Sequence, residues 1–421
     1  MNATHAVSSR LNQMKYLWEE AADNYFHPVK FPISLQSCIT TARTVTFILQ
    51  SNKSYIENFS EWYQPYQTKW AADPIMTWAK EARNSIEKKG DLETFSQIKC
   101  RIIASYFGGP ETEWLPQDIF SSPGQLHAMV PRSLVSQKQI YEHGTLLIER
   151  RWIDKNLPHT EVLDALVHVY DEFRHMLFDL HRILGLQTPT ELSQIAPPLP
   201  QPLLMDRALY LSVKTGGIVG TRYITREVTD DEALLRKRYK RAPGWNKVPH
   251  AKSFREICDI YFSNARAVMT KDGFHRPLCI LFRGNNLLRI ISMDHPDRAS
   301  RYVLVRELAQ IANRIGADAV MLISEAWTSR KEDLPPSGYA VDAENRGEAL
   351  ILNAGDSNGN VYMYDALVVR KKNKRHKIKK LEPTKYSEEG LPFILVPFQD
   401  SWNCLDIDKL KELSGEIPDW D

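Results

Sequence analysis

A proline-rich stretch between Leu186 and Met205 constrains the fold of this 421-residue chain more than any other feature. Proline lacks a backbone N–H and has a fixed φ, so the stretch can continue neither a helix nor a sheet. Such a run is extended and semi-rigid, as linkers are. The sequence therefore predicts a domain at 1–185, a linker at 186–204 and a second domain at 205–421. The prolines are Pro189, Pro197, Pro198, Pro200 and Pro202.

Apolar residues before the linker recur at spacings of three and four, which is the period of one helix face. The pattern predicts bundle helices, one from Pro74 to about Lys89 and the longest from Thr160 to Leu184. Thr160 is the expected N-cap of the longest helix. Two segments that are richer in β-formers, 98–106 and 145–152, are predicted to pair as strands. The periodic residues of the first two helices are Leu11, Met14, Leu17, Trp18, Cys38, Ala42, Val45 and Leu49.

After the linker the pattern changes to short β-rich runs separated by turns. Segments 207–213 and 218–228 flank paired glycines and are predicted to form a hairpin, followed by a short charged helix at 230–239. From Ser253 onward, the order of helices and strands predicts one mixed sheet with two helices on one face. The fold class is thus a helical domain followed by an α+β domain with a mixed sheet flanked by helices. The expected helices are 253–269 and 298–315, and the expected strands are 278–282, 287–293, 319–324, 348–354 and 361–369.

The chain is close to neutral, with 54 Lys and Arg residues against 52 Asp and Glu residues. The first 200 residues hold 19 basic and 22 acidic side chains, and the rest hold 35 and 30. This balance excludes a histone-like polycation, but it leaves an excess of positive charge in the second domain.

The N-terminus lacks the apolar run of a signal peptide, and no stretch of about 18 apolar residues occurs. The five cysteines are widely spaced and never form a C-x-x-C pair, which disfavours a disulfide framework and a structural zinc site. We expect a soluble, cytoplasmic protein without a membrane partner.

One face of the predicted 160–184 helix carries carboxylates and imidazoles three or four residues apart. Side chains one turn apart can reach the same ion, so this face is a candidate metal site. A metal also needs ligands from a second helix, and the sequence identifies none. The alternative is a solvated or partner-binding face that Asp–His pairs four residues apart stabilise. The candidate ligands are Asp164, His168, Asp171 and His175.

A second candidate site follows from topology. A right-handed β-α-β crossover through the 298–315 helix would end both of its strands at one edge of the sheet. Asp294, His295 and Glu325 would then meet there, and Glu348 would return to the same edge at the start of the next strand. Such a group could hold Mg²⁺ or Mn²⁺, or serve as acid and base in a hydrolase.

A third candidate is the basic segment 370–380, which holds eight formal positive charges in eleven residues. It follows a strand, so it is expected to form an exposed loop or a hairpin tip that contacts phosphates. The alternatives are solvation and pairing with acidic residues near the C-terminus, from Asp406 to Asp421. The candidate nucleic-acid-binding residues are Arg370, Lys371, Lys372, Lys374, Arg375 and Lys377, with Arg236, Lys237 and Arg238 from an earlier basic run.

Common nucleotide-binding and hydrolase motifs are absent from the sequence. The segment Ala82–Asp91 resembles the R-N-x-x-x-H motif of HEPN domains, a family of helical modules that includes RNases of toxin, CRISPR and phage-defence systems. Arg83 and Asn84 match the motif, but Lys88 stands where the family has histidine. The resemblance implies an inactive HEPN-like helper domain, in which Arg83 and Asn84 are kept for structure or contact.

Three hypotheses follow. The first is an intracellular nucleic-acid-associated protein, of a bacterial defence or stress system, that acts through the basic segment. The second is a divalent-metal-dependent hydrolase with its site at Asp294, His295, Glu325 and Glu348. The third is a non-enzymatic scaffold that binds a protein partner or a second copy of itself.

Overall fold

The chain divides into two compact units, each described here by itself. The computed structural model describes residues 3–90, 92, 94–106, 113–192, 207–220, 238, 251–335, 339–371 and 374–414. The first unit comprises Met1–Ile102, Thr112–Pro131 and Leu146–Leu211. The second comprises Ile103–Glu111, Arg132–Thr145 and Ser212–Asp421.

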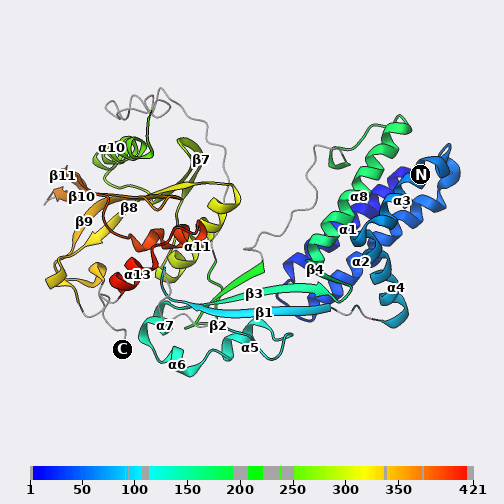
Figure 1. The fold of residues 1–421 in the computed structure, drawn as a ribbon, viewed down its shortest axis with the longest axis horizontal. Coiled ribbons are helices and arrows are strands. Elements are labelled where there is room, and N and C mark those ends of the chain that lie inside the picture. Colours follow the sequence, from blue (N-terminus) through cyan, green and yellow to red (C-terminus); the bar gives the residue numbers. More distant parts are fainter. Residues whose placement is uncertain are drawn as a thin grey trace. The chain divides into compact units, whose positions relative to one another are not determined.

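The first unit contains a bundle of five long helices (Figure 1). Their apolar faces meet in one continuous core, as the spacing of three and four predicts. The helices are α1 (Ala3–Asp23), α2 (Lys30–Ser51), α3 (Phe59–Ala72), α4 (Pro74–Lys89) and α8 (Val162–Ile183), and short 3-10 turns lie at Lys53–Tyr55 and Thr190–Leu192.

Helix α8 begins two residues later than predicted, because Glu161 and not Thr160 is its N-cap. The Glu161 carboxylate accepts the first free backbone N–H groups of the helix, while Thr160 belongs to the strand β4 (Leu157–Glu161). Burial raises the pKa of Glu161 to about 7. The cap is therefore part of the buried core rather than of the surface.

A five-stranded sheet in the order β2-β1-β3-β4 continues this unit, with β5 paired to β3. The predicted neighbours 98–106 and 145–152 are confirmed as adjacent strands. β5 pairs with β3, and the Ser212 N–H donates to the Gly217 carbonyl at 2.8 Å, so a turn is present at the predicted glycine pair. Residues 221–228 of the second predicted arm lie outside the described residues, as does most of the predicted 230–239 helix. The strands are β1 (Thr94–Ile103), β2 (Glu113–Trp114), β3 (Thr145–Asp154) and β5 (Ala208–Ser212), and the short helices between them are α5 (Pro123–Ala128), α6 (Arg132–Val135) and α7 (Lys138–His143).

The second unit is built on a seven-stranded sheet in the order β11-β10-β9-β8-β6-β7, with β12 paired to β10. Each strand pair is antiparallel, so the α+β class is confirmed although the parallel pairs of a mixed sheet do not occur among the described strands. The strands are β6 (Leu278–Arg283), β7 (Asn286–Ser292), β8 (Ala319–Thr328), β9 (Gly347–Asp356), β10 (Val361–Lys371), β11 (Lys374–Leu381) and β12 (Lys385–Ser387).

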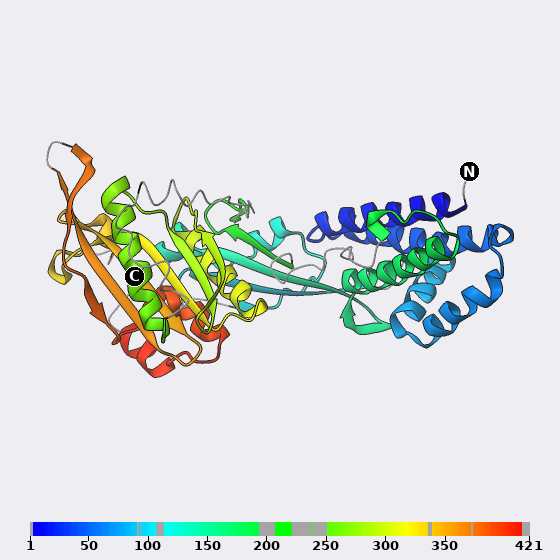
Figure 2. The same cartoon turned by 90° about the horizontal axis from the view of Figure 1, so that it is seen from above.

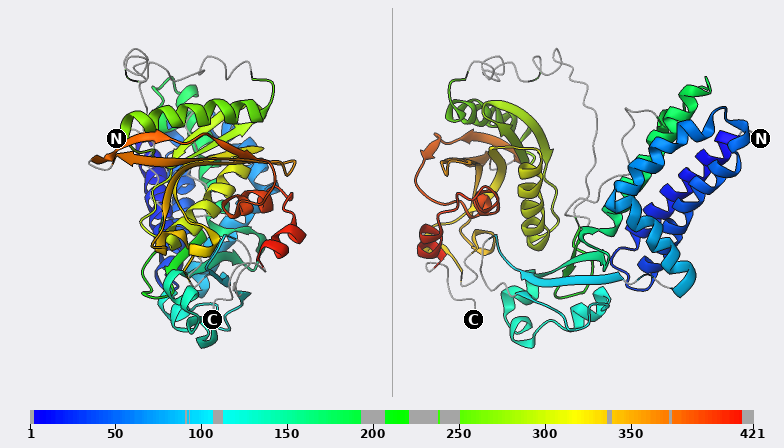
Figure 3. Two further views of the ribbon diagram at one scale, coloured as in Figure 1. Left: turned by 90° about the vertical axis from the view of Figure 1, so that its left-hand side faces the viewer. Right: turned by 45° about the vertical axis from the view of Figure 1, so that its right-hand side comes forward.

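Helices cover both faces of this sheet, where the sequence predicted one covered face (Figure 3). On β8, Met321 and Ile323 pack with α10 (Phe254–Asp272), whereas Val320 and Leu322 pack with α11 (Arg298–Arg314). Successive strand residues point to opposite faces, so strands that are apolar throughout need cover on both sides. The remaining elements are α12 (Val396–Ser401), α13 (Ile407–Ser414) and 3-10 turns at Lys331–Asp333, Ala340–Asp342 and Phe393–Leu395.

The two units depart from the predicted boundary in two respects. Residues 207–211, which the sequence assigns to the second domain, belong with the first unit. Two segments that precede the linker belong with the second unit. The Tyr106 ring packs edge-on against Tyr302 with centroids 4.8 Å apart, and the Gln139 side chain donates to the Ala104 carbonyl at 3.1 Å. Residues 193–204 of the predicted linker lie outside the described residues. Within the described ranges, no helix is long and apolar enough to cross a membrane.

Trp152 of β3 anchors the sheet of the first unit to its bundle. Its side chain is fully buried, stacks on Phe31 with ring centroids 4.7 Å apart, and donates to the Tyr25 carbonyl at 2.9 Å.

We expect Trp152→Ala to lower the free energy of unfolding by about 3–5 kcal/mol, because it leaves a large cavity. Urea denaturation followed by circular dichroism measures the change. The control Trp327→Ala removes a half-exposed indole and should cost less than about 1 kcal/mol; equal costs would contradict the anchoring role.

Candidate functional site

Two of the predicted metal ligands on α8, Asp164 and His168, pair with other elements of the same unit. His168 Nε2 lies 2.6 Å from Asp73 Oδ2, and Asp73 is also the N-cap of α4. Burial alone would raise the pKa of Asp73, but hydrogen bonds from His168 and from the backbone hold it below its usual value. Arg207 Nη2 lies 2.5 Å from Asp164 Oδ1.

The other two predicted metal ligands form a local pair. Asp171 accepts from Arg174 at 2.6 Å, and His175 Nδ1 lies 3.8 Å from the second oxygen of Asp171. Asp164, His168 and Asp171 thus each have a different partner. No group of three or more His, Cys, Asp or Glu side chains in the described parts of the chain is arranged to hold a metal ion. The geometry gives the metal hypothesis no support.

Helix α3, which the sequence analysis does not identify, donates hydrogen bonds to carboxylates of α8. The α3 residue number rises as the α8 number falls, as two antiparallel helices require. With Asp73 and His168 as the last contact, these bonds form what we call the α3–α8 ladder. Its other members are Trp62 and Tyr66, which donate to Asp179 at 2.8 and 3.0 Å, and Lys69 and Trp70, which donate to Glu172 at 2.6 and 2.9 Å.

A sequence signal for this ladder exists. Trp62, Tyr66 and Trp70 recur every four residues, so they share one face of a helix. Each has a polar tip that needs an acceptor when it is buried. A row of such donors indicates a partner helix with carboxylates at matching intervals.

In the second unit, Glu325 and Glu348 lie together on the α10 face of neighbouring strands. Trp327 pairs with Glu348 in the ladder between β8 and β9, which places Glu325 on the diagonal. Burial raises the pKa of Glu325. The backbone N–H of His275 donates to the Glu325 carboxylate and opposes this shift, whereas the nearby Glu348 carboxylate raises the pKa further.

Arg370 forms an ion pair with one of these two carboxylates, Glu348. Its guanidinium binds both oxygens of Glu348 and donates to the Gly273 carbonyl at the C-terminal end of α10, at 3.0 Å. A cation at a helix C-terminus is favourable because free carbonyls point toward it. Glu325, Glu348 and Arg370 therefore form a clasp between α10 and the sheet, and we use the name Glu–Arg clasp for these three residues.

Asp294 and His295 lie elsewhere on that edge. β7 and β8 are both antiparallel to β6, so they end at the same edge as predicted, but β6 separates them. Strands are about 4.8 Å apart, which puts β7 and β8 roughly 10 Å from each other. Burial and Arg301 lower the pKa of His295, while Asp294 and Asp297 oppose them. The predicted hydrolase residues are thus divided between two places.

The basic segment forms a two-stranded antiparallel ribbon, β10 with β11. Its first cation, Arg370, is committed to the Glu–Arg clasp, and Lys380 lies 2.7 Å from Glu382. Lys371 and Lys377 are exposed. Lys372 and the side chains of Lys374 and Arg375 lie outside the described residues. Among the described side chains, no ion pair joins the ribbon to the acidic residues from Asp406 to Glu412.

Two other predicted contacts stand apart from the ribbon. Arg236 and Lys237 lie outside the described residues, and Arg238 lies 2.6 Å from Asp272. In α4, Arg83 donates to Asn84 at 3.1 Å and lies 2.6 Å from Glu87. These local contacts do not test the HEPN resemblance, which stays a prediction.

Comparison with known proteins identifies relatives. A family described as "Bacteriophage lambda protein ea47" matches residues 2–414, a range that contains each candidate residue above. Protein ea47 of Escherichia phage lambda is 27% identical to this chain over 394 residues, which cover 92% of this chain and 94% of that protein. No solved structure matches the chain.

The Glu–Arg clasp predicts opposite effects for its two carboxylates. Because the pKa of Glu325 is raised in the folded state, ionising this carboxyl costs the folded state free energy. The stability that protonated Glu325 contributes is fully present below the unfolded pKa of about 4.3, and it is lost as the pH rises through the folded pKa. Glu325→Gln should therefore raise the melting temperature at pH 8 and flatten its fall between pH 5 and pH 8. Glu348→Gln weakens the charged acceptor of Arg370 and should lower stability by about 1–3 kcal/mol. Thermal unfolding across this pH range tests both variants, and a Glu325→Gln protein that is less stable than the parent at pH 8 would contradict the assignment.

Proposed function

Since the chain belongs to the family of bacteriophage lambda protein ea47, we propose that it is a phage-related protein that binds nucleic acid through the β10–β11 ribbon. The observation that carries the proposal is a projecting pair of strands with exposed cations. The family match supports the phage context, and the ribbon supports the ligand.

The shape of the ribbon suits a nucleic-acid groove. β11 is the edge strand of the sheet, and Figure 2 shows the two strands continuing beyond the body of the sheet. The major groove of B-DNA is about 12 Å wide and admits a two-stranded ribbon. Several known DNA-binding proteins insert a ribbon in this way.

The described cations of the ribbon are available to phosphates. Ile378 packs into the α10-side core, so Lys377 and Lys379 on either side of it point the other way. These two lysines and Lys371 are exposed and form no ion pair with any described residue. Each phosphate contact that such lysines make releases condensed counterions and strengthens binding at low salt.

Lysines on an edge strand also have a structural explanation, because they discourage pairing with the strand of another molecule. The two roles differ in a measurable way. Edge protection alone gives no salt-dependent affinity for a polyanion, whereas phosphate contact does. We assign no base specificity to the ribbon, and the defence or stress system stays a prediction.

We expect neutralising the ribbon to weaken DNA binding. The triple variant Lys371→Gln, Lys377→Gln, Lys379→Gln should bind a 30-base-pair duplex roughly 10²- to 10³-fold more weakly at 100 mM NaCl. The slope of log affinity against log salt should become shallower by about 3, since three contacts are lost. Fluorescence anisotropy from 50 to 300 mM NaCl measures both quantities.

A matched control removes the same charge elsewhere. Lys53, Lys138 and Lys271 are exposed lysines of other elements, and their triple change to Gln should leave the slope close to that of the parent. Equal weakening in both triple variants would show a general charge effect and contradict the ribbon as the site. No measurable binding by the parent at 50 mM NaCl would overturn the proposed function.

A further inference from the structure

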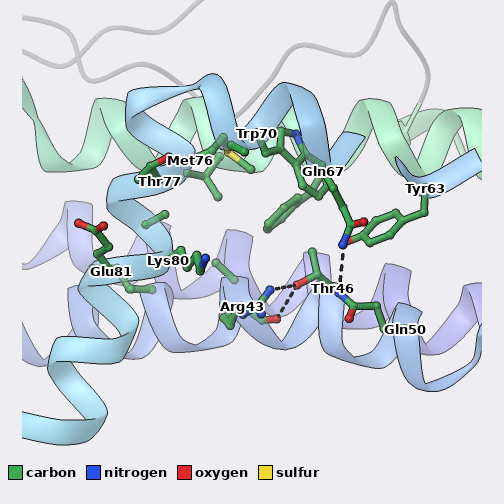
Figure 4. Close-up of a pocket in the computed structure, with 16 residues that line it drawn as sticks. Arg43, Thr46, Gln50, Tyr63, Gln67, Trp70, Met76, Thr77, Lys80 and Glu81 are labelled. Carbon is green, nitrogen blue, oxygen red and sulfur yellow. Dashed lines mark hydrogen bonds between the residues drawn. The ribbon is translucent and has the colours of Figure 1, made fainter. Parts of the chain in front are cut away.

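The helical bundle of the first unit contains a cavity of about 400 Å³ between α2, α3, α4 and α8 (Figure 4). This volume falls within the range of small-molecule sites, which bind ligands among apolar walls with a few placed polar groups. The cavity belongs to the first unit and the ribbon to the second, and they are formed by different parts of the sequence.

Arg43 brings a positive charge to the cavity. Its guanidinium donates to the Thr46 hydroxyl at 2.9 Å and lies 4.3 Å from the centre of the Phe47 ring. Among the described residues, no carboxylate lies within ion-pair distance of it, and Figure 4 places Glu81 well away from it. Burial lowers the pKa of Arg43, and the neighbouring Arg83 adds to that effect.

Such an arginine is costly unless something compensates it. A partly buried charge loses solvation, and one neutral hydroxyl and the face of one aromatic ring replace only part of it. Lys80 also lines the cavity and adds a second cation, against the single carboxylate of Glu81. The cavity is therefore suited to a small anion.

The opposite part of the cavity is aromatic and amide-lined. The Tyr63 and Trp70 rings lie 6.0 Å apart at an interplanar angle of 79°, and Phe173 packs edge-on against Trp70 at 5.3 Å. Gln50 donates to the Tyr63 hydroxyl at 3.3 Å, and the Gln67 amide lies beside the same ring in Figure 4. Aromatic faces bind flat rings, and amide groups can pair with the donors and acceptors of a base.

We propose that this cavity binds a small anion with a flat heteroaromatic ring, of the class of nucleoside monophosphates. The phosphate binds Arg43, with Lys80 as the second cation. The base lies against Tyr63 and Trp70, and Gln67 contacts its edge. This site is independent of the nucleic-acid binding proposed for the ribbon.

The test uses the full chain and isothermal titration calorimetry with AMP, GMP, CMP and UMP as separate probes. We expect at least one of them to bind and to raise the melting temperature, because a ligand of the folded state stabilises it. Adenosine and inorganic phosphate are the two partial probes, and each should bind more weakly than the best nucleotide. Phosphate binding as tightly as every nucleotide would overturn the role of the ring.

Variants locate the site. Arg43→Gln should weaken nucleotide binding about tenfold or more, because a charge-assisted contact is lost. Ala79→Phe adds a bulky side chain to the cavity wall and keeps Arg43 in the sequence; it should abolish binding, which keeps the test valid if Arg43→Gln does not fold. The control Arg132→Gln removes an exposed arginine of α6 that does not line the cavity, and it should bind like the parent.

Two results would overturn the site: no binding of any of the four nucleotides at 10 mM, or equal binding by the parent and by both cavity variants. The ribbon variant Lys371→Gln, Lys377→Gln, Lys379→Gln should retain nucleotide binding, so a failure of one site is distinguishable from a failure of the other. Loss of nucleotide binding in the ribbon variant would show that the nucleotide binds at the ribbon and not in the cavity, and would overturn the proposal.

Discussion

The helical unit depends on the α3–α8 ladder. Tyr63 is the one residue of α3 that is buried, and the other large aromatic side chains of this helix, Phe59, Trp62, Tyr66 and Trp70, pack against the core only in part. Indole, hydroxyl and ammonium donors on α3 meet carboxylates on α8, and each donor that leaves water is compensated by a charged acceptor. Because these polar contacts fix α3 at its α8 side, the helix is not required to pack tightly on α2. The cavity beside Arg43 lies between these helices, where Gln50 of α2 donates to the Tyr63 hydroxyl of α3.

Local sequence signals predict the elements whose limits are set locally. Ser253 and Asp297 cap α10 and α11 through their own side chains, and a glycine follows α10 at positive φ, so both helices are readable from composition and period. Helix α3 is not predicted from its sequence, because its apolar face consists of tryptophan and tyrosine and because Pro65 lies inside the helix. The carboxylates of α8 that accept hydrogen bonds from this face lie more than a hundred residues further along the chain.

The candidate sites show the same limit. The ends of β7 and β8 and the start of β9 lie at one edge of the sheet, as predicted, because strand direction follows from the order of the elements. That order does not show that β6 lies between β7 and β8, nor that Arg370 belongs to Glu348. Two groups that the sequence assigns to different functions, a catalytic carboxylate and a phosphate-binding arginine, neutralise each other in the fold. Sequence separation hides such a pair, since only cross-strand register brings it together.

The interleaved course of the chain has a consequence for its synthesis. The backbone passes between the two units five times before the second unit is complete. Tyr106 leaves the ribosome long before the helix that it packs against, since Tyr302 follows it by almost two hundred residues. Domains generally fold from the N-terminus as they are made. Here the early segments have to wait without their partners, so the second unit assembles only after most of the chain has been translated.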